Sequence, residues 1–588
     1  MALIDKASLL MVPSTYEAGK LYNVLPSGNR APDNKGGAGY DQTRADFDFD
    51  RGSNAAATRI NSSGLIEKYR ENLFTESNNF SDSDWTKSGV SVTSGQSGYD
   101  ETTNAYKIQV LTSGAPRKIA HNQTTANGVL TMSIYAKAGT APIIAVEASG
   151  SNGFYKYFNL STGTGGSQGG SIVDSSIVDV GSGWYRLSIT GNPTTVTSPQ
   201  FFVCDVDNST TAATGSNILI QNAQLESGLV ATEYLNSTSV TAKAGVLVDM
   251  PRINYDANGE NGALLLEPSR QQLLPYSEDF SNSAWGKANV TLTSNNTISP
   301  DGTQNASKLV ATGSDSSLQD SISVTSGTTY TLSVYLKTVS GTLDMAISLG
   351  SPGFPQNEGE GGRYKNITVT NEWKRYTLTS TADASASTGI GVGGFNSFTT
   401  GEEVYVWGAQ LEAGSYATSY IPNHGESGGV TRAADIVSGK EDSSLYNDNE
   451  GVLFVEFSAL SDTRDNEFRF LISDGTNSER LQIGLQTSGN LYASVITGNS
   501  ASASFSYSLP NPTQTHKIAL KYKVNDCVLF VDGVERGTDT SATMPSGLDV
   551  FDFYRTSVNN NYVEANVKKV IFFNEALSDS ELATLTTL

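Results

Sequence analysis

Short stretches of alternating apolar and polar residues recur along the chain and predict β-strands. TLSVYLK (331–337) alternates in this way apart from one tyrosine, and EEVYVWGAQLE (402–412) follows the same pattern. A period of two is that of a half-buried strand. Turns rich in Gly, Asn and Ser follow at about ten-residue spacing, which favours β-sandwiches or jelly rolls over alternating strands and helices. Only residues 578–588 and 64–70 have a helical pattern.

Two long segments of the chain resemble each other. ENLFTESNNFSDSDWTK (71–87) aligns with QQLLPYSEDFSNSAWGK (271–287) at an offset of 200 residues. NAQLESGLVATEYL (222–235) aligns with GAQLEAGSYATSYI (408–421), so the first copy is 14 residues longer, mostly between 140 and 180. Self-similarity of this kind predicts two modules of the same fold.

The segments that precede the two copies also repeat. TRINSSGLIEKYREN (58–72) resembles PRINYDANGENGALLLEPSRQQ (251–272), with Glu67 over Glu267, and a fragment of it, GVTRAADIV (429–437), follows the second copy. The predicted division is an N-terminal segment 1–60, a first module with its connector 61–236, a connector 237–270, a second module 271–422, a connector 423–447 and a C-terminal domain 448–588.

The C-terminal domain reads as a third β unit. GVLFVEFSAL, RLQIGLQTSGNLYASVI and HKIALKYKVNDCVLFVDGVERG are strand-like segments joined by tight turns. Asp474-Gly475 and Asp532-Gly533 are hairpin signals, because both residues tolerate positive φ.

Composition and charge narrow the functional classes. Lys and Arg number 38 against 60 Asp and Glu, which gives a net charge of −22 and a field that repels nucleic acid. Charged residues make up 17% of the chain, and its 57 glycines indicate turn-rich β structure, as in extracellular or virion proteins. No apolar run is long enough to span a membrane, and the N-terminus is a poor signal peptide, so we expect release by cell lysis.

The motifs also carry a resemblance. LLPYSEDFSNSAW (273–285) and VYVWGAQLEAGSYATSYIPN (404–423) resemble a module of tailed-phage tail-fibre and virion proteins, which is similar in pattern to the jelly-roll carbohydrate-binding modules of bacterial glycanases. FVDGVE (530–535) and VKKVIFFNEALSDSELATL (567–585) resemble the concanavalin A-like, or laminin-G-like, lectin domain. LIDKASLLMVPSTYEAGKLYNVLPS (3–27) resembles the start of the same phage proteins.

The resemblance implies an all-β chain: two tandem jelly-roll β-sandwich modules, then a concanavalin A-like β-sandwich, with an irregular N-terminal segment that anchors it to other virion proteins. It implies a tail fibre or receptor-binding protein, made in the host cytoplasm and carried on the virion. Such a protein adsorbs to host surface polysaccharide without cleaving it, as a homo-oligomer, with a trimer favoured. The alternative is a head-fibre, decoration or tail-assembly protein whose modules bind neighbouring virion subunits.

Trp407 is the first candidate for glycan contact. Its counterpart in the first copy is Gln221, and an unpaired amide in a core is costly, so we expect this position to be exposed. Tyr405 shares its face of the strand, whereas Val404 and Val406 point to the core. An exposed tryptophan can stack on a sugar ring, and a module interface would explain it equally.

Further candidates lie elsewhere on the chain. Tyr155 and Tyr157 fall in the part where the first copy is longer, where ordinary strand alternation is the competing explanation. Tyr492, Tyr554 and Arg555 could line a sugar groove in the C-terminal domain.

Catalysis and metal binding find little support in the sequence. The acidic pairs Asp48/Asp50, Glu358/Glu360 and Glu402/Glu403 lie in hydrophilic or Gly-rich stretches typical of solvated turns, and no catalytic motif occurs, so we predict no enzymatic activity. The three histidines lack metal-site spacing. Related glycanase modules hold calcium partly through Asp residues on the last strand, where this chain has Trp407-Gly408 and Gln221-Asn222. We therefore expect no cofactor, with a structural calcium ion as the alternative. The Gly-rich loop 350–366 lacks the context of a phosphate cradle.

Overall fold

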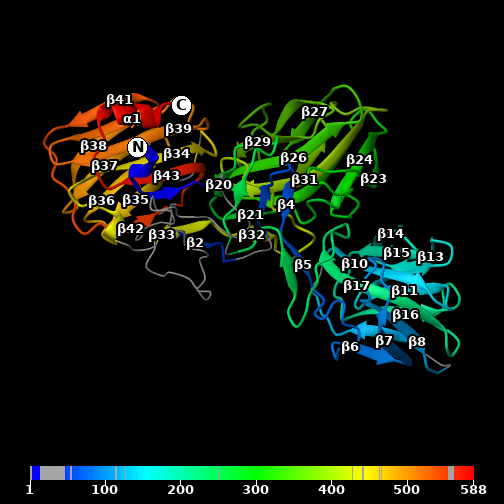
Figure 1. The fold of residues 1–588 in the computed structure, drawn as a ribbon. Helices are drawn as coiled ribbons and strands as arrows, with labels where there is room; N and C mark the ends of the chain where they lie inside the picture. The colour runs from blue at the N-terminus through cyan, green and yellow to red at the C-terminus, as the bar shows by residue number, and fades with distance from the viewer. Residues whose placement is uncertain are drawn as a thin grey trace.

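The computed structural model of the protein contains three β-sandwiches (Figure 1). The first module is blue to cyan, the second is green, and the C-terminal sandwich is yellow to red. This confirms the predicted all-β class. The structure describes residues 3–12, 47–52, 56–112, 116–125, 128–248, 250–426, 428–439, 443–462, 464, 467–553 and 562–588. In these ranges no helix is long and apolar enough to cross a membrane.

The first module consists of two six-stranded antiparallel sheets packed over one core. One sheet has the order β14 (Ile172–Gly181), β15 (Trp184–Gly191), β10 (Leu130–Ala138), β17 (Asn217–Ser227), β8 (Ala105–Val110), β7 (Val90–Gln96). The other has the order β13 (Thr164–Gly170), β12 (Phe154–Asn159), β11 (Ile143–Ser149), β16 (Ser198–Cys204), β9 (Lys118–His121), β6 (Trp85–Ser88).

The second module repeats this topology with five strands in each sheet. One sheet runs β29 (Lys374–Thr381), β26 (Thr329–Thr338), β31 (Glu403–Ala413), β24 (Ala306–Ala311), β23 (Val290–Thr297). The other runs β28 (Tyr364–Val369), β27 (Leu343–Ser348), β30 (Ala386–Gly393), β25 (Ser317–Val324), β22 (Trp285–Ala288). The extra length of the first copy thus supplies β13 and β14, one added edge strand for each sheet.

The aligned tryptophans occupy the same core position in both modules. Trp85 is 1% exposed and donates its indole N–H to the Glu76 carbonyl at 2.9 Å. Trp285 is 3% exposed and donates to the Tyr276 carbonyl at 2.8 Å. The shared sequence anchors therefore reflect a shared core.

The C-terminal sandwich takes strands from distant parts of the chain. Its first sheet has the order β19 (Ile253–Asn254), β20 (Ala263–Leu266), β43 (Ala565–Phe573), β34 (Glu450–Ala459), β39 (His516–Lys523), β40 (Cys527–Val531), β41 (Val534–Asp539), and β1 (Ala7–Met11) also pairs with β43. Its second sheet has the order β2 (Phe47–Asp50), β33 (Ile436–Gly439), β42 (Val550–Asp552), β35 (Phe468–Ser473), β36 (Arg480–Leu485), β37 (Asn490–Thr497), β38 (Ser500–Ser508).

Two predictions for the C-terminal domain are confirmed, the Asp532-Gly533 hairpin turn and the C-terminal helix. Asp532 and Gly533 both have positive φ and join β40 to β41 as a two-residue hairpin turn. The C-terminal helix α1 (Asp579–Thr586) begins at Ser578, whose side chain forms a capping box with Glu581. The helical expectation for 64–70 is wrong, because this stretch contributes to the short strands β4 (Ile66–Lys68) and β5 (Arg70–Asn72).

The predicted irregular N-terminal segment is corrected where the structure describes it. After the short 3-10 helix η1 (Leu3–Lys6), β1 lies in the C-terminal sandwich, and β2 pairs with β33. Leu9 and Met11 are 1% and 0% exposed within the sandwich core. The sandwich therefore extends beyond the predicted range 448–588, because its core needs apolar strands from both ends of the chain.

The connectors form β-hairpins that dock on a later part of the chain. β3 (Thr58–Ile60) pairs with β4, and this hairpin lies against the second module, where the Ile66 N–H donates to the Pro300 carbonyl at 2.9 Å (Figure 1). The hairpin β19–β20 instead joins the C-terminal sandwich. Two further strand pairs complete the connections: β5 with β18 (Ala242–Ala244), and β21 (Arg270–Gln272) with β32 (Val430–Arg432). The 3-10 helix η3 (Ser443–Leu445) follows β32 and β33.

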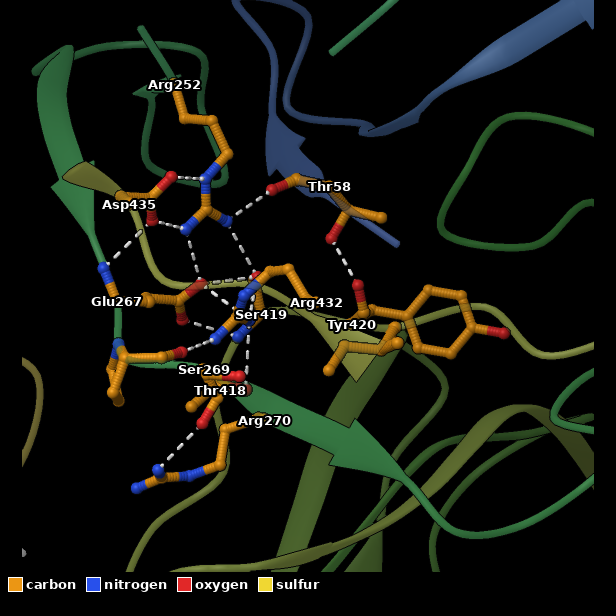
Figure 2. A network of polar contacts seen from close by, with 12 residues as sticks. Thr58, Arg252, Glu267, Ser269, Arg270, Thr418, Ser419, Tyr420, Arg432 and Asp435 are labelled. Atoms are coloured by element: carbon orange, nitrogen blue, oxygen red, sulfur yellow. Dashed lines mark hydrogen bonds and ion pairs between the residues drawn. The ribbon is translucent and has the colours of Figure 1, made fainter. Parts of the chain in front are cut away.

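A buried polar network joins these connectors (Figure 2). Glu267 accepts from Arg252 and Arg432, each at 2.8 Å, and from the Ser419 hydroxyl and N–H, each at 2.6 Å. Asp435 pairs with Arg252 and with Arg51. The side chains of the two carboxylates and three guanidinium groups are all 5% exposed or less.

The pKa shifts follow from this pairing. Burial alone would raise the pKa of Glu267, but Arg432 and Arg252 outweigh it and lower the pKa to about 2. Burial also works against the charge of Arg252, yet Asp435 and Glu267 raise its pKa. Glu267 and Arg252 are therefore charged at neutral pH, and the network holds together three segments of the chain that are distant in sequence.

We expect Leu9→Ala to destabilise the C-terminal sandwich by about 2–5 kcal/mol, because it leaves a cavity beneath β43. Hydrogen exchange of residues 565–573 measures this. Tryptophan fluorescence cannot follow it, since all five tryptophans lie in the modules. The control is Val240→Ala, at a side chain 69% exposed, which should change stability by less than about 0.5 kcal/mol. Unchanged exchange in Leu9→Ala would contradict the placement of β1.

We expect the Glu267 network to give a specific acid dependence. The pKa of Glu267 is depressed in the folded state, so its stabilisation is complete above its ordinary pKa and is lost as pH falls from about 5 through about 2. The loss is about 3 kcal/mol, measured as unfolding free energy against pH. Glu267→Gln should flatten the profile in this window, and an unaltered profile would refute the assignment.

Candidate functional site

Trp407 is not exposed, and that prediction is wrong. It is fully buried, in a cluster with Ile66, Ala306 and Tyr420. The assignment of strand faces was correct, because Val404 and Val406 lie in the module core and Trp407 lies on the opposite face. That face is covered by the connector hairpin β3–β4 and by the segment that closes the module.

Lys68 explains why this position differs between the modules. Its ammonium lies 5.7 Å from the centre of the Trp407 ring and pairs with Asp301 at 2.6 Å and Glu278 at 3.0 Å. Burial works against the charge of Lys68, but these two carboxylates raise its pKa. In the second module a lysine from the connector thus neutralises two buried acids.

In the first module an amide takes the place of this lysine. Gln221 is 1% exposed, and its side-chain NH₂ donates to both carboxylate oxygens of Asp100 at 3.1 Å. Its side-chain oxygen accepts from the Tyr99 N–H at 3.1 Å. Gln221 is therefore buried and satisfied, which removes the premise that a glutamine marks an exposed position.

The AQLE signature is structural in both copies. Gln224 accepts from the Leu235 N–H at 2.8 Å, and Gln410 accepts from the Ile421 N–H at 2.7 Å. The glutamates two residues later accept from the Thr232 and Thr418 N–H groups at 2.9 and 2.7 Å. These buried bonds tie the last strand to the closing segment, so the motif marks fold rather than ligand.

Tyr157 is also a structural residue. It is 6% exposed and packs with Phe202 and Cys204 on the outer side of its sheet. Asp207, in the loop after β16, reaches β13 and accepts from the Ser167 hydroxyl at 2.8 Å, so this loop crosses above the cluster. Burial raises the pKa of Tyr157 to about 12. Its expected role in glycan contact is corrected accordingly.

Three other candidates are not gathered into one site. Tyr155 is half-buried, with its ring 6.0 Å from that of Tyr157. Tyr405 is half-buried, 6.5 Å from Trp373. Tyr492 is half-buried, lies across Gly484, and has the Arg469 guanidinium 5.3 Å from its ring centre. Tyr554 and Arg555 lie outside the described residues.

The structure reveals a groove on the second module that the sequence argument missed. It lies between β27, β28 and the loop after β30, with a volume of about 640 Å³. This is within the range of ligand sites. Its lining is mostly polar with one aromatic ring: Asp344, Met345, Asn366, Ile367, Thr368, Phe395, Asn396, Ser397, Thr399 and Glu402.

Phe395 forms the aromatic wall of this groove. Its ring stacks on Tyr364 with centroids 4.1 Å apart and an angle of 13°, and the Arg363 guanidinium lies 5.2 Å from its centre. Phe395 and Asn396 have φ of 57° and 53°, a conformation that non-glycine residues rarely adopt. Backbone strain of this kind clusters at functional sites.

Hydrogen bonds fix the groove loop in place. The Ser397 hydroxyl accepts from the Ala346 N–H of β27 at 2.8 Å, and the Asn396 N–H donates to Asp315 at 2.9 Å. Ser397 thus occupies the gap where β27 diverges from β30, since these strands pair only at residues 347–348 and 391–392. The groove is therefore preformed rather than dependent on a ligand.

The groove is rich in hydrogen-bonding groups and carries negative charge. Asp344 accepts from the Thr368 hydroxyl at 2.6 Å, and Asn366 donates to Glu358 at 2.8 Å. Glu402 accepts from the Thr399 hydroxyl at 3.1 Å. None of its lining residues is basic. Within the described ranges, the groove included, no group of three or more His, Cys, Asp or Glu could hold a metal ion.

Sequence signals for this groove were present but ambiguous. GGFNSF (393–398) places a phenylalanine among turn residues, and Tyr364 ends the Gly-rich loop that we considered only as a phosphate cradle. Neither segment alternates as a strand does. Only the fold brings Tyr364, the first residue of β28, next to Phe395 in the loop after β30.

Comparison with known proteins agrees with part of the resemblance. Residues 455–583 match the family model of the concanavalin A-like lectin/glucanases superfamily. No curated protein matches the chain.

Solved structures match a quarter of the chain. The CBM40 of the Ruminococcus gnavus IT-sialidase, bound to α2,3-sialyllactose, is 15% identical over 25% of this chain and 86% of its own, with a TM-score of 0.22. Domain 4 of AbnA, a GH43 extracellular arabinanase from Geobacillus stearothermophilus in complex with arabinotriose, is 11% identical over 26% and 73%, with a TM-score of 0.22. The receptor-binding domain of botulinum neurotoxin C/D mosaic serotype is 10% identical over 26% and 40%, with a TM-score of 0.21. Similarity at this level carries no argument about function.

We expect Trp407→Ala to lower the unfolding free energy by about 3–5 kcal/mol, because it opens a cavity under Lys68 and the hairpin β3–β4. Urea unfolding measures the loss. Tyr405→Ala, two residues away on the same face but half-buried, is the matched control and should cost clearly less. Equal losses would show that burial does not distinguish the two positions.

Proposed function

We propose that the protein binds glycans without cleaving them, and that the groove beside Phe395 is its principal site. The observation that carries this is a preformed polar groove with a single aromatic wall on a rigid sandwich. An aromatic ring accepts the apolar face of a pyranose, while carboxylates and amides bind its hydroxyl groups. The match of residues 455–583 to a lectin/glucanase superfamily supports a carbohydrate ligand for the chain, although these residues form the C-terminal sandwich and not the groove.

Phe395, Tyr364, Asp344 and Asn366 have stated roles in this proposal. The sugar ring packs on Phe395, held in place by Tyr364 behind it. Asp344 and Asn366 offer an acceptor and a polar amide to hydroxyl groups. The lining carries two carboxylates, Asp344 and Glu402, and one guanidinium, that of Arg363, lies over Phe395. The balance is negative and favours a neutral glycan over an anionic one.

Three carboxylates of the acidic pairs considered above, Glu358, Glu360 and Glu403, are engaged by neighbouring side chains. Glu358 binds Asn366, and Glu360 binds Lys365 at 2.5 Å. Glu403 pairs with Lys308 at 3.1 Å. Each of these carboxylates is bonded to a neighbouring polar side chain, whereas glycosidases need two carboxylates that face one substrate bond. This arrangement supports binding without cleavage.

The biological setting that we propose is the surface of a phage virion, as a tail fibre or receptor-binding protein. The resemblance of the modules and of the N-terminus to such proteins supports this, and the net charge of −22 argues against nucleic-acid partners. One shallow groove binds weakly, so adsorption would require several copies acting together.

The alternative remains a head-fibre, decoration or tail-assembly protein. The docking of each connector hairpin on a later part of the chain favours it, since module faces in this chain already serve as protein-binding surfaces. Adsorption to host cells distinguishes the two: a receptor-binding protein loses adsorption when surface polysaccharide is stripped, and a decoration protein is unaffected.

We expect Phe395→Ala to weaken binding to purified host polysaccharide at least tenfold, because the wall for the sugar ring is lost. Biolayer interferometry measures binding, and circular dichroism checks the fold. Tyr405→Ala, a half-buried aromatic of the same module outside the groove, is the matched control and should bind normally. If Phe395→Ala binds as well as the unaltered chain, the groove is not the glycan site.

A further inference from the structure

We propose that the cleft between the two modules is a second ligand site, which takes one sugar ring of a neutral glycan. The cleft has a volume of about 510 Å³, which is within the range of ligand sites. Its walls come mainly from connector residues 66–73, the closing segment 226–233 of the first module, and residues 301–305 and 422–426 of the second module. Its lining residues are all different from those of the groove beside Phe395. This site assumes, as proposed above, that the chain binds glycans, but it does not depend on the groove.

The internal repeat explains why this cleft is open. The alignment of 222–235 with 408–421 places Val230 where the second copy has Tyr416. Tyr416 is 7% exposed, and its hydroxyl donates to Glu564 at 2.9 Å. Val230 instead lines the cleft, because a valine is too short to fill the volume of a tyrosine. The first copy therefore has space for a ring where the second copy supplies one.

An arginine beside this position is present in both copies. In the second copy the Arg270 guanidinium lies 5.6 Å from the centre of the Tyr416 ring, a cation–π distance. Arg70 aligns with Arg270 and lines the cleft. Among the residues that the structure describes, none forms an ion pair or hydrogen bond with the Arg70 side chain. The first copy thus has the guanidinium without the ring that packs against it.

Three further polar side chains in the lining are available to a ligand. Within the described ranges, the side chains of Ser227, Glu233 and His424 make no hydrogen bond and no ion pair. Glu233 accepts hydrogen bonds, Arg70 donates them, and the serine hydroxyl and the imidazole can do either. These groups come from both modules and from the connector, so one ligand in the cleft can contact all three parts of the chain.

This set of groups fits a sugar ring better than a phenol such as that of Tyr416. A phenol carries one hydroxyl group, whereas a pyranose carries one on most of its carbon atoms and can pair with several of these side chains at once. Leu73 and Val230 add apolar surface for the face of the ring. The lining holds both acidic and basic side chains, which favours a neutral sugar over a charged one.

The first test fills the cleft with the residue of the second copy. Saturation-transfer NMR on the full chain uses glucose, galactose, mannose and N-acetylglucosamine as probes at millimolar concentration. The chain carries Phe395→Ala, so that the groove does not contribute. We expect transfer to at least one sugar, and its loss when Val230→Tyr is added. Val240→Tyr, the same change at a side chain 69% exposed and outside the cleft, is the matched control and should keep the signal.

The outcomes separate this site from the groove. Persistence of the signal with Val230→Tyr overturns the proposal, as does a Phe395→Ala chain that shows no transfer to any of these sugars. Transfer that is present in the unaltered chain and lost in Phe395→Ala shows that sugars bind at the groove alone. Absence of transfer in both chains contradicts glycan binding altogether.

The second test removes the guanidinium. Arg70→Ala in the Phe395→Ala chain should lose the same signal while circular dichroism shows an unchanged fold, so the result does not depend on the folding of Val230→Tyr. Undiminished transfer in Arg70→Ala overturns the proposal. p-Cresol, which has the ring of a tyrosine side chain, is a further probe for the class of ligand. Uptake of p-cresol without uptake of any sugar overturns the assignment to a sugar.

Discussion

The buried pairing of Glu267 and Asp435 with arginines is the interaction on which the arrangement of the chain depends. Arg252 stands at the start of the second connector, Glu267 at its end, and Arg432 and Asp435 in the third connector. Breaking one partner would leave a charge buried without compensation, which costs several kcal/mol. The second and third connectors are therefore tied to each other and, through Ser419, to the closing segment of the second module.

The repeat in the connectors acquires a physical meaning from this network. Arg59 pairs with Glu67 at 2.7 Å in the first connector, as Arg252 pairs with Glu267 at 2.8 Å in the second. The first pair is partly exposed and the second is buried. The same pair of residues in the hairpin motif therefore lies near the surface in the first connector and in the interior in the second. The repeated feature is an arginine–glutamate ion pair between the two strands of a hairpin, and each hairpin packs on a sandwich that follows it in sequence.

Local pattern and internal repetition were sufficient to predict the class of fold, the two modules and the C-terminal sandwich. They could not predict contacts between segments distant in sequence. The local sequence predicts that Trp407 is exposed, because Lys68, which packs over its ring, lies in a connector more than three hundred residues earlier. The local sequence predicts no strand at β1, because the strand that it pairs with, β43, lies more than five hundred residues later. The groove needs Tyr364 and Phe395 together, and no periodicity relates those positions.

The two modules differ in which outer faces of their sheets are covered by other parts of the chain. In the second module the connector hairpin buries the outer side of β31, and the groove beside Phe395, where we propose glycan binding, lies on the opposite sheet. In the first module the Gln221 side chain binds Asp100, the acidic residue at the corresponding position. The loop after β16 covers the sheet of β11, β12 and β16, which corresponds to the sheet that carries the groove in the second module. The two copies share a core and have diverged on both faces. Duplication here preserved the fold and left the second module with the open groove.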